Sequence, residues 1–596
     1  MEFEQKAEEK KMSMSKNIAR LAVTAGLTAA LSFGGVMAPV TMAFAECVPT
    51  VATENGKVFI TDPDTEYTDT SFKGIQIFKA TVTQNKDGNT WSGDKTLSDI
   101  DWASLEVQKA VIGAFTRADG TRVDGAPRTD TSAQAWAKYI NDHAGDKVDQ
   151  TAKVDADSTL DKIAAALEGS NLTWTKPSDS SKGNFESLDQ GYWLFVTDVP
   201  SKTGNTDAYT SPIFTIVGGS DVNVAPKKSV PNVTKAVKDD NNGSFVTDES
   251  KNVFEAPNRV ADSASDQLIE YQLAGTVASN INTYKEYSYT FTDVLPSTMV
   301  PELVNDKPVV KVKIGDKTVE PKYYDAQYNT AKNELVVSFG NLKKEIKSDK
   351  DEVITVSGSS KIYVNYKAKL DPTKVKADML GKGQKNTVTL TYSNNPHSTE
   401  TGTTVVHPAY DYTYGIDVTK VGDEETPKKL SGVVFKLQEK NGGTVEDEYI
   451  DANGVKQANA ENAKLTTTED GKISVIGLDE GTYVLTEVTP APGYDNSHGN
   501  KGITFTITRG TLSESDATVV NPAVAVTDGD NTGLVKAENS TDGMVHLTVT
   551  DKKGSGLPLT GLNGVTFTWI AGGAVLVIGV AHLIRSRKQA EESEQE

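Results

Sequence analysis

The sequence predicts a mainly β protein of tandem β-sandwich domains, preceded by an N-terminal domain of mixed α and β structure. Three observations carry this fold class. Thr, Val and Tyr recur in alternation, although aromatic residues make up only 7% of the chain. The alternating segments are short, and turns rich in Gly, Pro and Asn separate them. Helical periodicity is clearest at two places before residue 170.

Residues 46–228 form the predicted mixed domain. A capping box, Thr-Ser-Ala-Gln at residues 131–134, opens one predicted helix, and Ser-Thr-Leu-Asp at 158–161 opens a second one that ends at Gly169. Strands at 192–197, 213–217 and 222–224 are expected to close the region. The segment 226–231, bounded by two prolines, is expected to be a linker.

Two immunoglobulin-like sandwiches are expected after the linker, over residues 229–408 and 409–556, with Pro408 at their boundary. The first is predicted to contain strands at 286–293, 309–314, 334–339, 361–370 and 386–392. The second is predicted to run from a strand at 414–421 to a strand at 545–551.

Apolar segments lie near both ends of the chain. Lys16 and Arg20 precede an apolar stretch at 21–40, and Ala-Phe-Ala at 43–45 offers small residues for cleavage, so a secretory signal peptide is predicted over 1–45 with Met12 or Met14 as an alternative start. Near the other end, a second apolar run covers 564–584, and Arg585, Arg587 and Lys588 follow it. As a helix this run could cross a core of about 30 Å, with the basic residues held in the cytoplasm.

Composition narrows the functional classes. A formal net charge of −21 argues against a nucleic-acid partner and favours the solubility of an exposed protein. A single cysteine rules out an intramolecular disulfide. Six scattered histidines and no local signature of a catalytic triad give no sign of a cofactor or an enzyme. The acidic residues Asp62, Asp64, Glu66 and Asp69 could bind calcium, but they lack the spacing of a known loop, and a solvated turn is expected.

In the second sandwich, three ionisable side chains fall in phase with apolar ones. Lys420 shares a strand face with Ile416 and Val418, while Glu487 and Asp551 lie in phase with apolar residues of two other strands. Because side chains alternate along a strand, a lysine and two carboxyls are predicted to point inward.

The first sandwich repeats the pattern with Lys235, Asp293 and Asn386. Isolated buried charges are costly, so one explanation is a buried ion network, or strand ends that already reach solvent. The other explanation is chemical. A desolvated lysine loses its proton easily and becomes a nucleophile, and a carboxyl in an apolar pocket stays protonated and donates to a carbonyl oxygen. Around an Asn or Asp carbonyl, these groups would form an amide crosslink and release ammonia or water.

The C-terminal segment resembles the sorting signal of Gram-positive surface proteins. Its pentapeptide is Leu557-Pro558-Leu559-Thr560-Gly561, followed by the apolar run and the basic tail. The resemblance implies that a sortase cleaves between Thr560 and Gly561 and passes the Thr560 carbonyl to an amine. The mature chain, residues 46–560, would then be attached to the cell wall, and only its precursor would be inserted in the membrane. An ordinary single-pass anchor is the alternative.

The second sandwich resembles the B-type repeat domain of Gram-positive collagen adhesins. The matching motifs are Val-Thr-Lys-Val at 418–421, Gly-Thr-Tyr-Val-Leu-Thr-Glu at 481–487 and Ala-Pro-Gly-Tyr at 491–494. That family forms a spontaneous isopeptide bond, which implies a bond from Lys420 to Asp551 with Glu487 as the assisting acid. Pilins of the family usually carry Asn where this chain has Asp551.

The first sandwich resembles the middle domain of backbone pilins. The matching motifs are Pro-Asn-Val-Thr-Lys at 231–235, Phe-Thr-Asp-Val-Leu-Pro at 291–296 and Asn-Thr-Val-Thr-Leu-Thr-Tyr-Ser-Asn-Asn-Pro at 386–396. The resemblance implies a bond from Lys235 to Asn386, assisted by Asp293. Each lysine is expected in the first strand of its domain and each acceptor in the last.

Residues 222–228, Val-Asn-Val-Ala-Pro-Lys-Lys, resemble the pilin motif, in which a lysine after proline attacks the sortase-bound Thr of the next subunit. Lys227 occupies that position, Lys228 is the alternative, and Ala225 stands where the family usually has Tyr. The resemblance implies the shaft subunit of a covalent pilus, with sortases, identical subunits, ancillary pilins and peptidoglycan as partners. A singly displayed or ancillary adhesin and a wall-bound enzyme are the competing functions.

Overall fold

The computed structural model describes residues 48–123, 125–145, 153–178, 181–238, 245, 259–495, 499–509, 523–527, 533–538 and 542–554. The predicted signal peptide, the sorting pentapeptide and the apolar run at 564–584 lie outside the described residues. Within the described part, no helix is long and apolar enough to cross a membrane. The chain divides into two compact units. One holds the described residues up to 412 apart from 264–266 and 375–382, and the other holds those two segments and the described residues from 413 onward.

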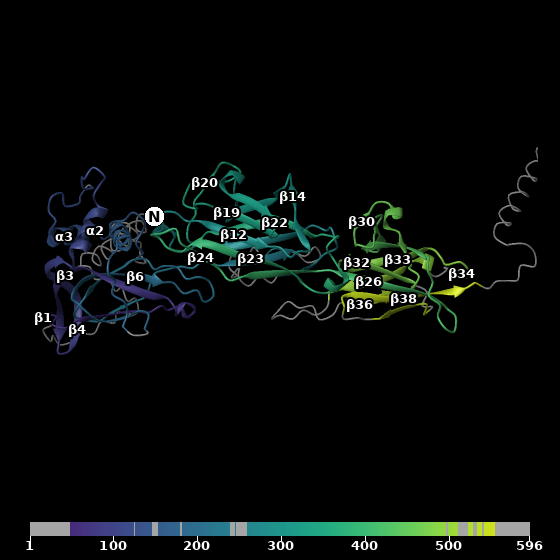
Figure 1. Cartoon of the computed structure of the whole chain (residues 1–596), viewed down its shortest axis with the longest axis horizontal. Coiled ribbons are helices and arrows are strands. Elements are labelled where there is room, and N and C mark those ends of the chain that lie inside the picture. The colour runs from purple at the N-terminus through teal and green to yellow at the C-terminus, as the bar shows by residue number, and fades with distance from the viewer. Residues whose placement is uncertain are drawn as a thin grey trace, which may run out of the picture. The chain divides into compact units, whose positions relative to one another are not determined.

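The predicted mainly β fold is confirmed, and the N-terminal part of the first unit is the one with long helices (Figure 1). A five-stranded sheet has the order β1-β3-β6-β7, with β4 on β3, and a three-stranded sheet has the order β5-β2-β8. The strands are β1 (Val48–Val51), β2 (Gly56–Ile60), β3 (Ser71–Asp87), β4 (Thr90–Trp102), β5 (Asn184–Leu188), β6 (Gly191–Val199), β7 (Ile213–Val217) and β8 (Val222–Val224). Strands β2 and β8, which come first and last in sequence among the strands of the three-stranded sheet, run parallel beside each other.

Three helices pack on the five-stranded sheet: α2 (Leu105–Ala114), α3 (Ala133–His143) and α4 (Thr159–Glu168). Ser132 caps α3 by accepting a hydrogen bond from the Ala135 amide, one residue later than the predicted box at Thr131 would place the cap. Ser158 caps α4 as predicted. Helix α2 was not predicted, although Ser104 caps it in the same way.

The rest of the first unit is a sandwich of two sheets. The first sheet has the order β10-β25-β23-β12-β19-β18 with β24 on β23, and the second has the order β17-β16-β22-β11-β9 with β13 on β22. Their strands are β9 (Val233–Lys238), β10 (Val260–Asp262), β11 (Ile269–Thr276), β12 (Tyr289–Val294), β13 (Met299–Pro301), β16 (Val310–Ile314), β17 (Lys317–Thr318), β18 (Asp325–Asn329), β19 (Glu334–Phe339), β22 (Lys361–Leu370), β23 (Gln384–Ser393), β24 (Thr401–Thr403) and β25 (His407–Tyr412). Two small ribbons add β14 (Leu303–Val304) with β15 (Lys307–Pro308) and β20 (Ile346–Lys347) with β21 (Val353–Ile354).

The expectation that both acceptors lie in the last strand of their domain is wrong for Asn386. It lies on β23, and β24 and β25 follow. Pro408, the expected boundary, lies inside β25 and pairs with Thr387 of β23. Proline is tolerated there because it is the second residue of a strand, where a missing amide interrupts little of the ladder. The exact domain boundaries stay a prediction.

The second unit is also a sandwich. Its first sheet has the order β32-β26-β38-β34 with β37 on β38, and its second has the order β30-β29-β27-β33-β35-β36 with β28 and β31 on β27. The strands are β26 (Tyr414–Gly422), β27 (Val434–Asn441), β28 (Thr444–Val445), β29 (Tyr449–Ile450), β30 (Lys456–Gln457), β31 (Leu465–Thr466), β32 (Lys472–Leu478), β33 (Gly481–Thr489), β34 (Tyr494–Asp495), β35 (Ile503–Thr508), β36 (Ala523–Thr527), β37 (Val535–Glu538) and β38 (Met544–Lys553). Strands β26 and β38 are parallel neighbours.

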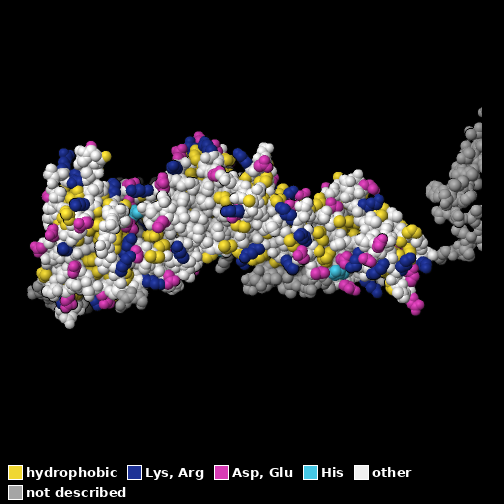
Figure 2. Space-filling view, in the orientation of Figure 1, with side chains coloured by type: hydrophobic (Ala, Val, Ile, Leu, Met, Phe, Trp, Pro, Cys, Tyr) yellow, Lys and Arg dark blue, Asp and Glu magenta, His cyan; other side chains and the backbone are white. Residues whose placement is uncertain are grey.

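The surface carries both signs of charge. On the face shown in Figure 2, acidic and basic side chains are interspersed, and apolar side chains are scattered among polar ones.

Candidate crosslinking sites

The first candidate site lies between the two sheets of the middle sandwich. Lys235 lies on β9 of one sheet, and Asp293 and Asn386 lie on β12 and β23 of the other. The predicted burial is confirmed, since the three residues are 1%, 0% and 0% exposed. Asp293 pairs with Val388, so Asp293 and Asn386 are diagonal neighbours on one sheet face. The structure therefore brings together all three residues that the sequence singles out.

A tyrosine that the sequence reasoning missed connects the three. Lys235 Nζ contacts the Asp293 carboxylate and donates to the Tyr366 hydroxyl at 3.0 Å. Asn386 Nδ2 also donates to that hydroxyl at 2.9 Å, and the hydroxyl donates to Asp293 Oδ1 at 2.9 Å. The Asn386 carbonyl oxygen is buried and accepts no hydrogen bond. Tyr366 thus holds the amide while leaving its oxygen open to a donor.

Burial shifts both members of this pair toward their neutral forms. Burial lowers the pKa of Lys235 to about 8, although the Asp293 charge opposes the shift. Burial raises the pKa of Asp293, against the opposite effects of Lys235 and Tyr366. Lys235 Nζ also lies 5.0 Å from the ring centre of Tyr271, a contact that favours the charged amine and so opposes the effect of burial. A neutral amine beside a neutral acid is the combination that attack on a carboxamide requires.

The second candidate site lies in the second unit. Lys420 on β26 pairs with Val549 of β38, which makes Asp551 its diagonal neighbour on the same face. Lys420 Nζ contacts Asp551 Oδ1 and lies 2.9 Å from Glu487 Oε2, which reaches it from β33 of the facing sheet. The three side chains are 0–1% exposed. The predicted inward orientation is confirmed here as well.

The Glu487 carboxyl of this second site has a raised pKa. Burial raises the pKa of Glu487 to about 7, Lys420 opposes that shift, and the Asp551 carboxyl adds to it. Two carboxyls around one ammonium cannot both be ionised cheaply. The amine lies directly against the Asp551 carboxyl that would be attacked, with the Glu487 carboxyl also within contact distance.

The two lysines of the linker lie in opposite environments. Lys227 is exposed, while its backbone is fixed, because its amide donates to the Thr210 hydroxyl at 3.1 Å and its carbonyl accepts from the Ser211 amide at 2.8 Å. The side chain of Lys228 is 6% exposed and turns into the protein. The structure thus separates two residues that the sequence left as alternatives.

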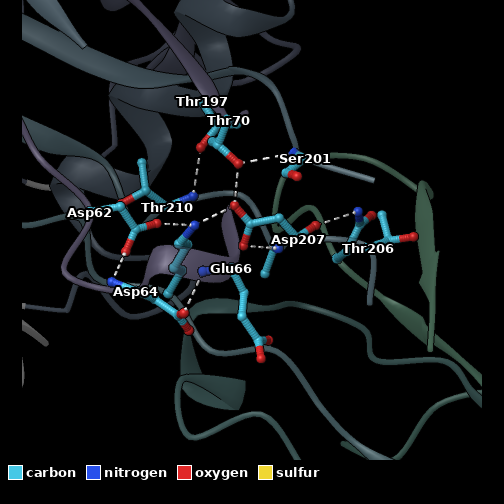
Figure 3. Close-up of polar contacts among 12 residues, drawn as sticks. Asp62, Asp64, Glu66, Thr70, Thr197, Ser201, Thr206, Asp207 and Thr210 are labelled. Atoms are coloured by element: carbon cyan, nitrogen blue, oxygen red, sulfur yellow. Dashed lines mark hydrogen bonds and ion pairs between the residues drawn. The ribbon is translucent and has the colours of Figure 1, made fainter. Parts of the chain in front are cut away.

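Lys228 ends between two carboxylates. Its Nζ lies 2.5 Å from Asp62 Oδ2 and contacts Asp207 Oδ2, and it lies 4.7 Å from the ring centre of Tyr67. Figure 3 shows Asp62 and Asp207 converging on this point, with the Thr70 hydroxyl also directed at Asp207. Lys228 was expected only as a substitute for Lys227, and Asp207 was not singled out. Because Asp62, Asp207 and Lys228 are far apart in the sequence, their spacing gave no indication that they meet in the fold.

The acidic residues of the turn at 62–69 have different partners. Asp62 pairs with Lys228, Asp64 caps the short helix η1 (Thr65–Tyr67), and Asp69 pairs with Lys182. The expectation of a solvated turn is wrong for Asp62, whose side chain is 11% exposed. In the described part of the chain, no group of three or more His, Cys, Asp or Glu residues could hold a metal ion.

Residues 415–522 match the family model of the SpaA prealbumin-like fold domain. This range contains Lys420 and Glu487 and ends before Asp551. Among curated proteins the chain has no significant match.

Three solved structures illustrate what the chain resembles. The T6 backbone pilin of serotype M6 Streptococcus pyogenes is 14% identical with a TM-score of 0.46, over 84% of this chain and 98% of that one. The full-length major pilin SpaD from Corynebacterium diphtheriae is 17% identical with a TM-score of 0.41, over 65% and 87%. BcpA, the major pilin subunit of Bacillus cereus, is 13% identical with a TM-score of 0.37, over 84% and 99%. TM-scores below 0.5 do not establish a common fold over the whole chain.

Proposed function

We propose that this protein is the structural shaft subunit of a covalently polymerised, cell-wall-anchored pilus, and not an enzyme. In this proposal sortase joins Thr560 of one subunit to Lys227 of the next, and internal bonds from Lys235 to Asn386 and from Lys420 to Asp551 stiffen each subunit. The last subunit is transferred to peptidoglycan. The prealbumin-like domain match over 415–522 and the sorting pentapeptide support this reading.

The observation that carries the proposal is the contrast among the lysines. Lys235 and Lys420 are buried against an acid and, within the same cluster, an amide or a second carboxyl. Lys227 is exposed on a rigid backbone. Buried amines react only with the groups packed around them, whereas an exposed amine can reach an acyl-enzyme on another molecule. Head-to-tail joining of this kind does not close on itself and gives an open filament.

Two chemical steps follow from the geometry. For Lys235, the neutral amine attacks Asn386 Cγ, Asp293 donates to the carbonyl oxygen, and the amide nitrogen leaves as ammonia. For Lys420, the amine attacks Asp551 Cγ, Glu487 supplies the proton, and an oxygen leaves as water. Each reaction occurs once per chain, so the protein is the product of this chemistry and not a catalyst.

Polymer formation in the native host tests the intermolecular half of the proposal. Wall extracts should contain a ladder of high-mass species that carries this chain. Lys227→Ala should abolish the ladder, whereas Lys57→Ala, an exposed lysine on β2, should leave it intact. A ladder that survives Lys227→Ala refutes Lys227 as the joint. A wild-type chain found only as a single wall-linked species would instead identify a singly displayed adhesin.

A further inference from the structure

A third group of residues repeats the arrangement of the two candidate crosslinks, and it lies in the N-terminal part of the chain. In each cluster a buried lysine ammonium contacts a carboxyl group. A second carboxyl or carboxamide side chain contacts the same lysine or one of its partners. At Lys228 the two acyl groups are Asp62 and Asp207, with side chains that are 11% and 0% exposed. No resemblance assigned a bond to these residues.

We propose that Lys228 forms an intramolecular amide bond with Asp62, assisted by Asp207. Lys228 Nζ lies 2.5 Å from Asp62 Oδ2, which is close enough for attack on the adjoining Cγ after a small rotation. This bond would exist whether or not the subunit is polymerised, so it does not rest on the proposed pilus.

Asp207 is the better placed of the two carboxyls to accept a proton from the amine and pass it on. It is completely buried, and burial raises its pKa even though Lys228 and Thr70 oppose the shift. Its position is fixed from several sides, because Thr70 donates to Oδ2 and the Ala208 amide donates to Oδ1 at 2.8 Å. Asn394 also holds its backbone, donating to the Asp207 carbonyl at 3.1 Å. A carboxyl held in this way can pass a proton without moving.

Asp62 is the better acceptor. The Asp64 amide donates to its Oδ1 at 3.0 Å, which leaves Oδ2 directed at the amine (Figure 3). Asp62 follows β2 and Lys228 follows β8, and these two strands are parallel neighbours paired at Ile60 and Val224. The bond would therefore join the start of the N-terminal domain to its end. A bond from Lys228 to Asp207 would close only a short loop.

The reaction balances without a co-reactant. Lys228 begins as an ammonium and Asp62 as a carboxylate. Asp207 takes a proton from the ammonium, the neutral amine attacks Asp62 Cγ, and a C–N bond forms. One C–O bond of Asp62 then breaks, and its oxygen leaves as water with the two protons that the nitrogen has lost. Two opposite charges disappear from a buried site, which removes the cost of keeping them there.

This bond would also decide between the two linker lysines. Once its nitrogen is part of an amide, Lys228 cannot resolve a sortase thioester. Lys227 would remain as the free amine of the pair, on a backbone that the neighbouring bond holds still.

The test is peptide mapping of the mature chain, residues 46–560, after digestion with chymotrypsin. We expect a branched peptide that joins the segments around residues 62 and 228, with a mass lower than the sum of its parts by one water. Lys228→Arg keeps the charge and should remove only this branch, while Lys227→Arg should leave it in place. Asp207→Asn should also remove it, since the acid is lost, whereas Asp62→Asn should retain it by releasing ammonia instead.

Each outcome decides the matter. Linear peptides around Lys228 in the wild-type chain would overturn the proposal, and so would a branch from Lys228 to Asp207. If Asp207→Asn left the branch in place, Asp207 would not be the assisting acid. The branches at Lys235 and Lys420 are measured in the same digest, and polymer formation is measured in wall extracts. A failure at Lys228 is thereby distinguished from a failure of the proposed function.

Discussion

Replacing Glu487 by Gln should prevent the Lys420–Asp551 bond and lower the stability of the second unit. Gln keeps the volume of the side chain but has no acidic proton to lend, so Lys420 and Asp551 should remain as an unreacted buried pair. Glu487 is the appropriate target because it reaches the pair from the facing sheet at 2.9 Å and is itself buried.

The size of the effect follows from the loop that the bond closes. A tie between residues 420 and 551 encloses about 130 residues, and by analogy with a disulfide it would raise the free energy of unfolding by about 5 kcal/mol. For a domain of this size, such a loss corresponds to a fall in melting temperature of roughly 10–20 °C.

Calorimetry and peptide mapping of the same preparations would measure both quantities. Glu448→Gln, an exposed position of the same unit, is the matched control and should change neither. A branched Lys420–Asp551 peptide in the Glu487→Gln chain would refute the role of the acid. A chain that lost the branch but kept its melting temperature would refute the loop-closure estimate.

Three further results are expected. Tyr366→Phe should slow or abolish the Lys235–Asn386 branch because the hydroxyl orients the amide, whereas Tyr363→Phe, on the other face of the same strand, should leave the branch intact in a peptide map. Asp551→Asn should yield a crosslinked peptide of the same mass as the wild type, because the product is the same amide and only the leaving group changes. A difference equal to the mass of one water or one ammonia would show that one of the two chains is unreacted. The His397 ring lies between Asp161, at 2.8 Å, and Glu168. Burial lowers the pKa of His397, but hydrogen bonds to the two carboxylates outweigh burial and raise it to about 9. This stabilisation, of the order of 3 kcal/mol, should be complete below pH 6.5 and lost as the pH rises through about 9, so in urea unfolding the gap between wild type and His397→Gln should close at high pH.

The alternation of apolar and polar side chains along strands was enough to find the two clusters of buried polar residues around Lys235 and Lys420. Lys235 and Lys420 stand out because each occupies a position where a strand otherwise places apolar residues toward the core, and the structure buries both. The same signal carried the prediction of the mainly β class. The helices α3 and α4 were found because each begins with a serine cap and keeps a regular apolar face.

Features that depend on packing between distant segments were not predicted. The inward position of Tyr366 follows from alternation along β22, but its role depends on β9 and β23 reaching it from two different sheets. The Lys228 cluster lies in loops and a linker, where side-chain direction has no period to detect. Asn386 was placed in a last strand because β24 has only three residues and Pro408 stands near the start of β25, which weakened the alternating pattern of both strands.

The parallel pairing of β26 with β38 has a mechanical consequence. A pull on the two ends of the second unit enters at Tyr414 and leaves beyond Lys553. With the proposed amide in place, the load would travel along β26 only as far as Lys420, cross to Asp551 and exit within a few residues. The residues between Lys420 and Asp551 would therefore bear no tension, because the crosslink bypasses them. With that bond in place, the segments between Lys420 and Asp551 could change in length and surface chemistry without weakening the path that carries the load.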